Sequence, residues 1–157
     1  MATPLTEVYK AFLSKIEEDE WCQNYNVDDL DWIYNDWLSI LESALPYFRY
    51  PRCSLEYNID EGFLDDKFGQ DEIQVIATYM KLEWLRRTIL SWKNVKTQYS
   101  EKDFSQANLL SNFIKLQEKT EEDARHLEHI YYRTIKRKSY DYGRLIGGNN
   151  HGKRRRR

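Results

Sequence analysis

The sequence has 157 residues, of which 41% are hydrophobic and 15% aromatic, and its formal net charge is −2. This length predicts one domain that can bury a core of its own. The small net charge conceals a polarised chain: residues 1–72 hold 17 acidic and 5 basic residues (net −12), residues 73–157 hold 9 and 19 (net +10), and the two sum to −2. Such a chain can attract its own copies head to tail, or place its basic part against a polyanion.

Several functional classes find no support in the sequence. No signal peptide or membrane-spanning stretch is visible, so we expect a protein made in the cytoplasm. Cys22 and Cys53 form no CxxC or Cys/His cluster, which favours reduced thiols over a disulfide. There is no glycine-rich phosphate loop, HExxH motif or nucleophile elbow. His126 and His129 are three residues apart, but with only Glu122 or Glu128 nearby and no other His in the folded part they make a poor metal site. We therefore expect no enzyme activity, no cofactor and no metal.

The first half of the chain predicts two amphipathic helices. Thr3 is the predicted N-cap of the first, with Pro4 at its first position, and the helix is expected to run to about Glu20. It ends in the acidic run Glu17–Glu20, which is either a solvated face or a contact for a basic partner. The second is predicted over Val27–Ala44, and its apolar positions are Leu30, Ile33, Tyr34, Trp37, Leu38, Leu41 and Leu45. The aspartates at 28, 29, 31 and 36 lack the spacing of a calcium loop, so we interpret them as solvated.

Residues 46–69 differ from the segments on either side. They contain two prolines, two glycines and an alternation at Leu55, Tyr57 and Ile59, which predicts an irregular loop or a short hairpin near 60–62. The segment is long for a connection in a compact domain. Either it is a functional loop or assembly contact, or it covers the core through Phe48, Leu55, Ile59, Phe63 and Phe68.

The central helix is predicted over Gln70–Lys96. Two adjacent apolar stripes make it apolar around most of its circumference, which is typical of a helix covered by others on several sides. The stripes are Ile73, Ile76, Met80, Trp84 and Val75, Tyr79, Leu82, Leu85, Ile89, Trp92. Lys81, Arg86 and Arg87 interrupt this pattern, so their charges must turn toward solvent, a neighbour or a channel.

A last helix of about 33 residues is predicted to begin at a cap formed by Asp103 or Ser105. Its apolar stripe thins over 117–123, which predicts exposure or a local kink. At this length it would project beyond a compact bundle. From Lys138 onward, glycines at 143, 147, 148 and 152 oppose a stable helix, and residues 153–157 are all cationic. We therefore predict a helical domain over 1–138 and an extended basic arm over 139–157.

The basic arm and the residues before it are the predicted partner-binding site. Residues 133–157 contain ten Lys or Arg against one acid, Asp141. These cations can neutralise phosphates without sequence specificity, or dock on an acidic protein surface. A solvated tail or a localisation signal is the alternative. The residues assigned to partner binding are Lys136, Arg137, Lys138, Tyr140, Tyr142, Arg144, Leu145, Ile146, Lys153, Arg154, Arg155, Arg156 and Arg157.

Over residues 60–135 the sequence resembles the head–tail connector (head-completion or neck adaptor) proteins of tailed bacteriophages. The stretches that carry the resemblance are FLDDKFGQDEIQVIATYMKLEWLRRTI and SEKDFSQANLLSNFIKLQEKTEEDARHLEHIYYRT. The shared features are an acidic helix start, the Met80–Trp84 step, and an Asp103–Phe104 step that opens a long polar helix. Neither the N-terminal helices nor the basic arm matches a family pattern.

The resemblance implies a small structural protein that forms a ring beneath the portal, with twelvefold symmetry. Such a ring extends the DNA channel, contacts DNA without sequence specificity, and docks further neck or tail proteins, often through C-terminal arms on the portal. It implies assembly in the host cytoplasm and a place at the virion neck, with no membrane. Two alternatives stay open: a nucleic-acid-binding accessory protein that uses the basic tail, and a small intracellular regulator that binds an acidic protein. In all three cases the predicted fold is an all-α helical bundle.

Overall fold

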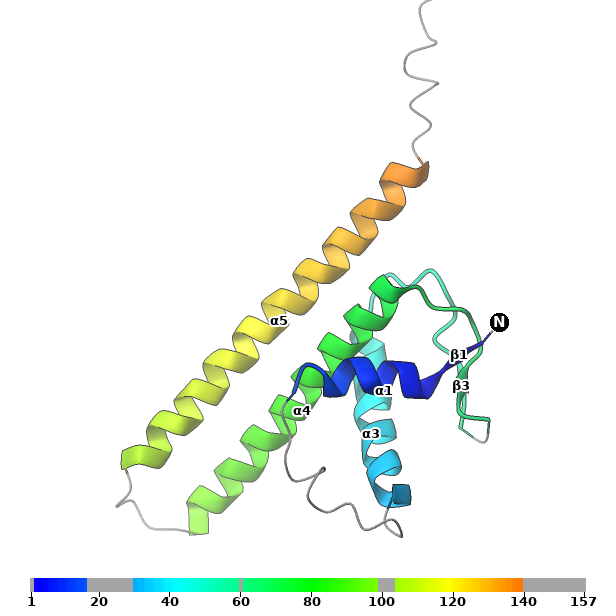
Figure 1. Ribbon diagram of the computed structural model, residues 1–157. Helices are drawn as coiled ribbons and strands as arrows, with labels where there is room; N and C mark the ends of the chain where they lie inside the picture. The colour runs from blue at the N-terminus through cyan, green and yellow to red at the C-terminus, as the bar shows by residue number, and fades with distance from the viewer. Residues whose placement is uncertain (1, 17–29, 60, 99–103, 140–157) are drawn as a thin grey trace, which may run out of the picture.

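The computed structural model describes residues 2–16, 30–59, 61–98 and 104–139. Residues 30, 92–98, 104–109 and 135–139 are described for their backbone alone. The fold is mostly helical, with helices α1 (Leu5–Leu13), α3 (Leu30–Ala44), α4 (Gln70–Gln98) and α5 (Phe104–Ser139) and the short 3₁₀ helix η2 (Leu45–Tyr47). Figure 1 shows α5 running beside α4, with α1 and α3 crossing α4.

Helix α4 lies at the centre, as its two apolar stripes predict. It contacts α1, α3 and α5, and its bounds extend the predicted helix by two residues. Ten of the fourteen residues from Glu72 to Leu85 are buried, including every residue from 75 to 80. A helix apolar on all sides is stable only when other elements cover it, which is the arrangement found here.

The first helix begins and ends differently from the prediction. Thr3 is not its N-cap, because Thr3 and Pro4 form strand β1 and the helix begins at Leu5. Pro4 has an extended backbone (φ −66°, ψ 137°) and takes the cap position itself. The helix ends at Leu13 instead of near Glu20, because the next residues form tighter bonds, such as the Lys15 N–H to the Phe12 carbonyl at 2.9 Å. Residues 17–20 lie outside the described part of the chain.

The second helix is confirmed over Leu30–Ala44, and its predicted start at 27–29 lies outside the described residues. Ile33, Trp37, Ile40 and Leu41 are buried on its inner side, whereas Tyr34 is 43% exposed. Pro46 lies inside η2, so the chain tightens into a 3₁₀ turn where the α-helix stops.

The all-α prediction needs correction, because a small antiparallel sheet accompanies the helices. Strands β2 (Tyr57–Asn58) and β3 (Phe63–Leu64) form the hairpin allowed by the sequence pattern, and β1 (Thr3–Pro4) joins its other edge in the order β1-β3-β2. Leu64 is paired with Thr3 on one side and Tyr57 on the other. Gly62 supplies the positive φ of 70° that the turn requires.

The rest of the 46–69 segment covers the core only in part. Phe48, Leu64 and Phe68 are buried, but Ile59 and Phe63 are exposed, so the predicted covering role fails at these two positions. Alternation explains the difference: Phe63 and Leu64 are neighbours on one strand, and only one of them can face inward. Leu64 takes that place.

Helix α5 is continuous over 36 residues, three longer than predicted, with no break at 117–123. That stretch is mostly exposed, and Thr120 is its one buried residue. The Tyr131 hydroxyl bonds to Glu72 in the first turn of α4, so α5 continues about two turns beyond the start of α4 (Figure 1).

Candidate functional site

The carboxyl group of Glu128 joins three parts of the fold. Its side chain is buried on α5, and Oε1 accepts the backbone N–H groups of Arg49 at 2.7 Å and Tyr50 at 3.2 Å. Oε2 accepts the hydroxyl hydrogen of Tyr79, on α4, at 2.7 Å. Burial, and then this hydrogen bond to Glu128, raise the pKa of Tyr79 well above its usual range. The bonds fix the chain after η2 against both long helices.

A second buried carboxyl group, that of Glu72 in the first turn of α4, makes a similar connection. It binds Tyr131, which lies about one turn after Glu128 on α5. Glu72 accepts the Gly69 N–H at 2.6 Å and the Tyr131 hydroxyl hydrogen at 2.9 Å. The Tyr131 hydroxyl in turn accepts the Arg52 N–H at 3.0 Å, and the Arg52 guanidinium lies 4.9 Å from the centre of the Tyr131 ring. Burial, followed by the bond to Glu72, raises the pKa of Tyr131 above its usual range. Residues 49–52 are thus held at both ends.

Beside these bonds lies a groove of about 340 Å³, which we call the tyrosine groove. Three elements line it: the 47–50 segment, one flank of α4, and one flank of α5. The lining residues are Tyr47, Arg49, Tyr50, Tyr79, Leu82, Arg86, Glu121, Arg125, Glu128, His129 and Tyr132. It combines four phenol rings with three guanidinium groups, a mixture enriched in protein interfaces.

The rings of the tyrosine groove contact one another in pairs. Tyr47 and Tyr79 are stacked with their centroids 6.1 Å apart, and Tyr50 and Tyr132 are tilted at 5.3 Å. The Arg86 guanidinium lies 4.7 Å from the centre of the Tyr47 ring, a cation–π arrangement. These contacts restrict the positions of the four rings and of the Arg86 guanidinium.

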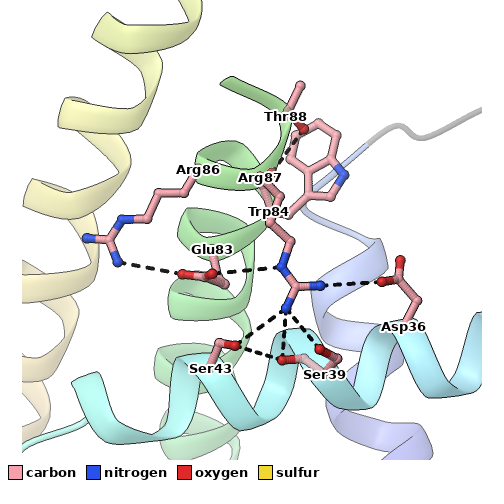
Figure 2. A network of polar contacts seen from close by, with 8 residues as sticks. All are labelled: Asp36, Ser39, Ser43, Glu83, Trp84, Arg86, Arg87 and Thr88. Atoms are coloured by element: carbon pink, nitrogen blue, oxygen red, sulfur yellow. Dashed lines mark hydrogen bonds and ion pairs between the residues drawn. The ribbon is translucent and has the colours of Figure 1, made fainter. Parts of the chain in front are cut away.

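Arg86 and Arg87, which interrupt the apolar pattern of α4, point in different directions. Figure 2 shows Arg86 directed toward α5 and Arg87 toward α3, with Glu83 between them. The Arg87 Nη2 donates to the carbonyl oxygen and hydroxyl of Ser39, both at 3.1 Å, and Nη1 lies 3.4 Å from Asp36. Arg87 is therefore used inside the fold, while Arg86 remains at the tyrosine groove.

A second hollow lies on the opposite flank of the α4–α5 contact. Lys15, Thr78, Lys81, Thr120, Asp123, His126 and Leu127 line it. Burial, and then the charge of Lys81, lower the pKa of Lys15. Between the two hollows, Ala124 is fully buried at the seam where the helices touch. His126 faces this hollow and His129 faces the tyrosine groove, so they do not lie together as a pair of metal ligands.

The structure describes only a small part of the predicted partner-binding site. The backbone of 136–138 continues α5, and their side chains, together with Tyr140, Tyr142 and all later predicted residues, lie outside the described part. Sequence reasoning missed the tyrosine groove. The signal that could have found it is the aromatic and basic run Tyr47–Arg52, in a segment already singled out as a possible assembly contact.

Cys53 is half-buried and donates its thiol hydrogen to the Lys67 carbonyl at 3.4 Å; burial raises its pKa. Cys22 lies outside the described residues. Over the residues that the structure describes, no three His, Cys, Asp or Glu side chains are grouped so that they could hold a metal ion. No described helix is both long and apolar enough to cross a membrane.

Comparison with known proteins adds no relative: no family model, curated protein or solved structure matches this chain.

Proposed function

We propose that this protein is a structural head–tail connector of a tailed phage, one subunit of a ring below the portal. The resemblance over residues 60–135 supports this proposal, since the two stretches that carry it correspond to α4 and α5. Such a role needs helices, loops and surfaces for neighbouring subunits, and it needs no catalytic group or cofactor.

The observation that carries the proposal is the way α5 is attached. It contacts α4 along a narrow seam, with a hollow on each flank, and continues beyond the start of α4. Its outer surface keeps apolar side chains in solvent: Leu116 is 40% exposed and Ile130 is 47% exposed. Leu116 and Ile130 lie about 21 Å apart along α5. They are separate apolar positions on a long helix whose outer side is open to further subunits.

A ring explains the polarised charge of the sequence. In a closed ring each copy presents one face to a different face of the next copy, so an acidic surface and a basic surface on one chain are complementary. We further propose that residues 1–138 act as a helical bundle domain within the ring wall. Residues 139–157 would then anchor it to the portal at the virion neck after assembly in the host cytoplasm, with twelve copies matching the portal.

Electron microscopy of purified portal rings mixed with this protein tests the proposal. We expect an added ring of density on the portal, and we expect truncation after Tyr140 to abolish its attachment. A truncated protein that still attaches as a complete ring would contradict the role of the arm. Absence of any added density with the full-length chain would contradict the connector proposal.

A second candidate function rests on a different observation. The ten basic residues against one acid in 133–157 favour nonspecific binding of nucleic acid by the basic tail. This candidate predicts DNA binding that depends on the tail and weakens steeply as salt rises. A full-length chain that binds no DNA at low salt would exclude it.

A further inference from the structure

The tyrosine groove carries more positive charge than its own carboxyl groups can balance. Its lining holds three guanidinium groups, those of Arg49, Arg86 and Arg125, against the two carboxylates of Glu121 and Glu128, and Glu121 pairs with Arg125. Arg86 shares Glu83 with Arg87. The guanidinium of Arg49 forms no ion pair with any residue in the described part of the chain. The groove therefore presents cationic groups that suit an acidic partner.

The rings define the second requirement for a partner. Tyr47 and Tyr50 are 41% and 56% exposed, so each offers an aromatic surface to an incoming side chain. Aromatic rings pack well against other aromatic rings, and a tryptophan is also the best partner for a guanidinium group. The best match to this groove is a short acidic segment that carries an aromatic residue.

The chain itself contains one such segment, EEDEW at residues 17–21. We propose that this segment of one copy binds in the tyrosine groove of a second copy. The inference rests on the proposed function, because it supplies the head-to-tail contact that a ring of identical subunits needs. The acidic residues pair with Arg49 and Arg86, and Trp21 packs on the tyrosine rings.

Chain length favours binding of this segment to the groove of a second copy over binding to the groove of its own chain. Lys15 lines the hollow on the opposite flank of the α4–α5 seam. An extended chain covers at most about 3.6 Å per residue, so Glu17 can lie only about 7 Å beyond Lys15 and Glu20 about 18 Å. Half the circumference of a helix 10–12 Å across is roughly 16–19 Å. Of this segment, only Glu20 and Trp21 could reach the groove around α5 of their own chain, so the other three acidic residues can bind there only from a second copy.

Two complementary variants of the full-length chain test the proposal. Arg49→Glu reverses the groove charge, and the four-fold variant E17Q/E18Q/D19N/E20Q removes the charge of the segment. Each variant alone should be monomeric by size-exclusion chromatography with light scattering at low salt. An equimolar mixture should form a dimer and nothing larger, because each pair then has one intact groove and one intact segment. A mixture that stays monomeric overturns the proposal.

Direct binding of a fluorescent peptide of residues 15–21 gives an independent readout. We expect binding that weakens with added salt and that Arg49→Glu weakens about tenfold, which is the effect of losing one favourable charge contact. Lys119→Glu is the matched control, since Lys119 is exposed on α5 and does not line the groove; it should bind the peptide as the wild type does. Equal affinity in Arg49→Glu and wild type overturns the proposal.

Three further outcomes separate this inference from competing ones. If oligo-dT binds in an Arg49-dependent way while the peptide does not bind, the groove is a nucleic-acid site and the proposal fails. If Arg49→Glu still forms a complete ring on the portal, the connector function stands and the groove assignment fails. A wild-type protein that stays monomeric well above the peptide's dissociation constant overturns the intermolecular contact, whatever the portal experiment gives.

Discussion

Glu128 of α5 accepts the hydroxyl hydrogen of Tyr79 of α4 at 2.7 Å, in a place where both side chains are buried. This bond crosses the seam between the two longest helices. The same carboxyl group also binds the backbone at Arg49 and Tyr50, so one side chain sets the position of the tyrosine groove's two walls and its loop. Stability and groove geometry should therefore change together when Glu128 is altered.

Replacing Glu128 with alanine should lower the free energy of unfolding by about 2–4 kcal/mol. The substitution leaves a buried hydroxyl and two backbone N–H groups without their acceptor, and each unsatisfied group costs about 1–3 kcal/mol when it stays dry. Glu128→Gln keeps an acceptor oxygen and should cost about 1 kcal/mol. Urea denaturation followed by circular dichroism measures both.

Glu122→Ala is the matched control for Glu128→Ala, because Glu122 is an exposed glutamate on the same helix. Its effect should stay within about 0.5 kcal/mol. Equal losses for the two alanine variants would show that helix propensity, and not the buried bonds, determines the result.

Stability should fall above about pH 10. Burial, and then hydrogen bonds to glutamates, raise the pKa values of Tyr79 and Tyr131, and burial also raises the pKa of Tyr9 to about 12. The folded state keeps these protons after the unfolded chain has lost them. Rising pH therefore favours unfolding, by roughly 1.4 kcal/mol per pH unit for each such phenol.

Denaturation curves at pH 8 and pH 11 measure this slope. Tyr79→Phe should reduce the pH slope of the free energy of unfolding by the contribution of one phenol. The variant should also be less stable than the wild type at pH 8. Leu82→Val is the control, since it removes buried volume beside the groove without removing a titrating group. It should leave the slope unchanged. A slope in Tyr79→Phe as steep as in the wild type would contradict the assignment to Tyr79.

Periodicity predicted the helices well because burial decides where a helix lies. Ile76, Met80 and Leu85 of the two predicted stripes are buried as expected, and α4 starts at the predicted residue. Periodicity contains no information on which distant segments meet. The sequence pattern allowed for the β2–β3 hairpin but missed the third strand. Strand β1 is only two residues long, and its partner β3 lies about sixty positions away in the sequence.

The tyrosine groove could not be predicted for the same reason. Its lining comes from positions 47–50, 79–86 and 121–132, and only the folded chain brings them together. The polar pair Glu72 and Glu128 also reads as surface in the sequence, because nothing local indicates that tyrosine hydroxyls and loop N–H groups will satisfy it. The sequence left solvent, a neighbour or a channel open as the surroundings of the Arg87 charge, and packing placed it against α3.

Thr3→Val should destabilise the fold by about 1–2 kcal/mol. The buried Thr3 hydroxyl accepts the Phe68 N–H at 2.8 Å and donates to the Asp66 carbonyl at 3.1 Å, so valine keeps the shape but leaves a buried donor unpaired. Thr6→Val is the control at an exposed position of α1. Thermal unfolding of both variants measures the difference, and equal midpoints would contradict the role of the Thr3 hydroxyl.

Arg87→Lys should cost about 1 kcal/mol, even though it keeps the charge. The guanidinium of Arg87 reaches the Ser39 carbonyl and hydroxyl with one nitrogen and Asp36 with another, and a lysine ammonium cannot reproduce this fork (Figure 2). The ion pair itself contributes little, because the Arg87 and Asp36 side chains are 35% and 40% exposed. Asp36→Asn should therefore change the free energy of unfolding by less than about 0.5 kcal/mol. Urea denaturation in low and high salt measures both variants. A larger loss in Asp36→Asn than in Arg87→Lys would show that charge, and not the hydrogen bonds to α3, holds the two helices together.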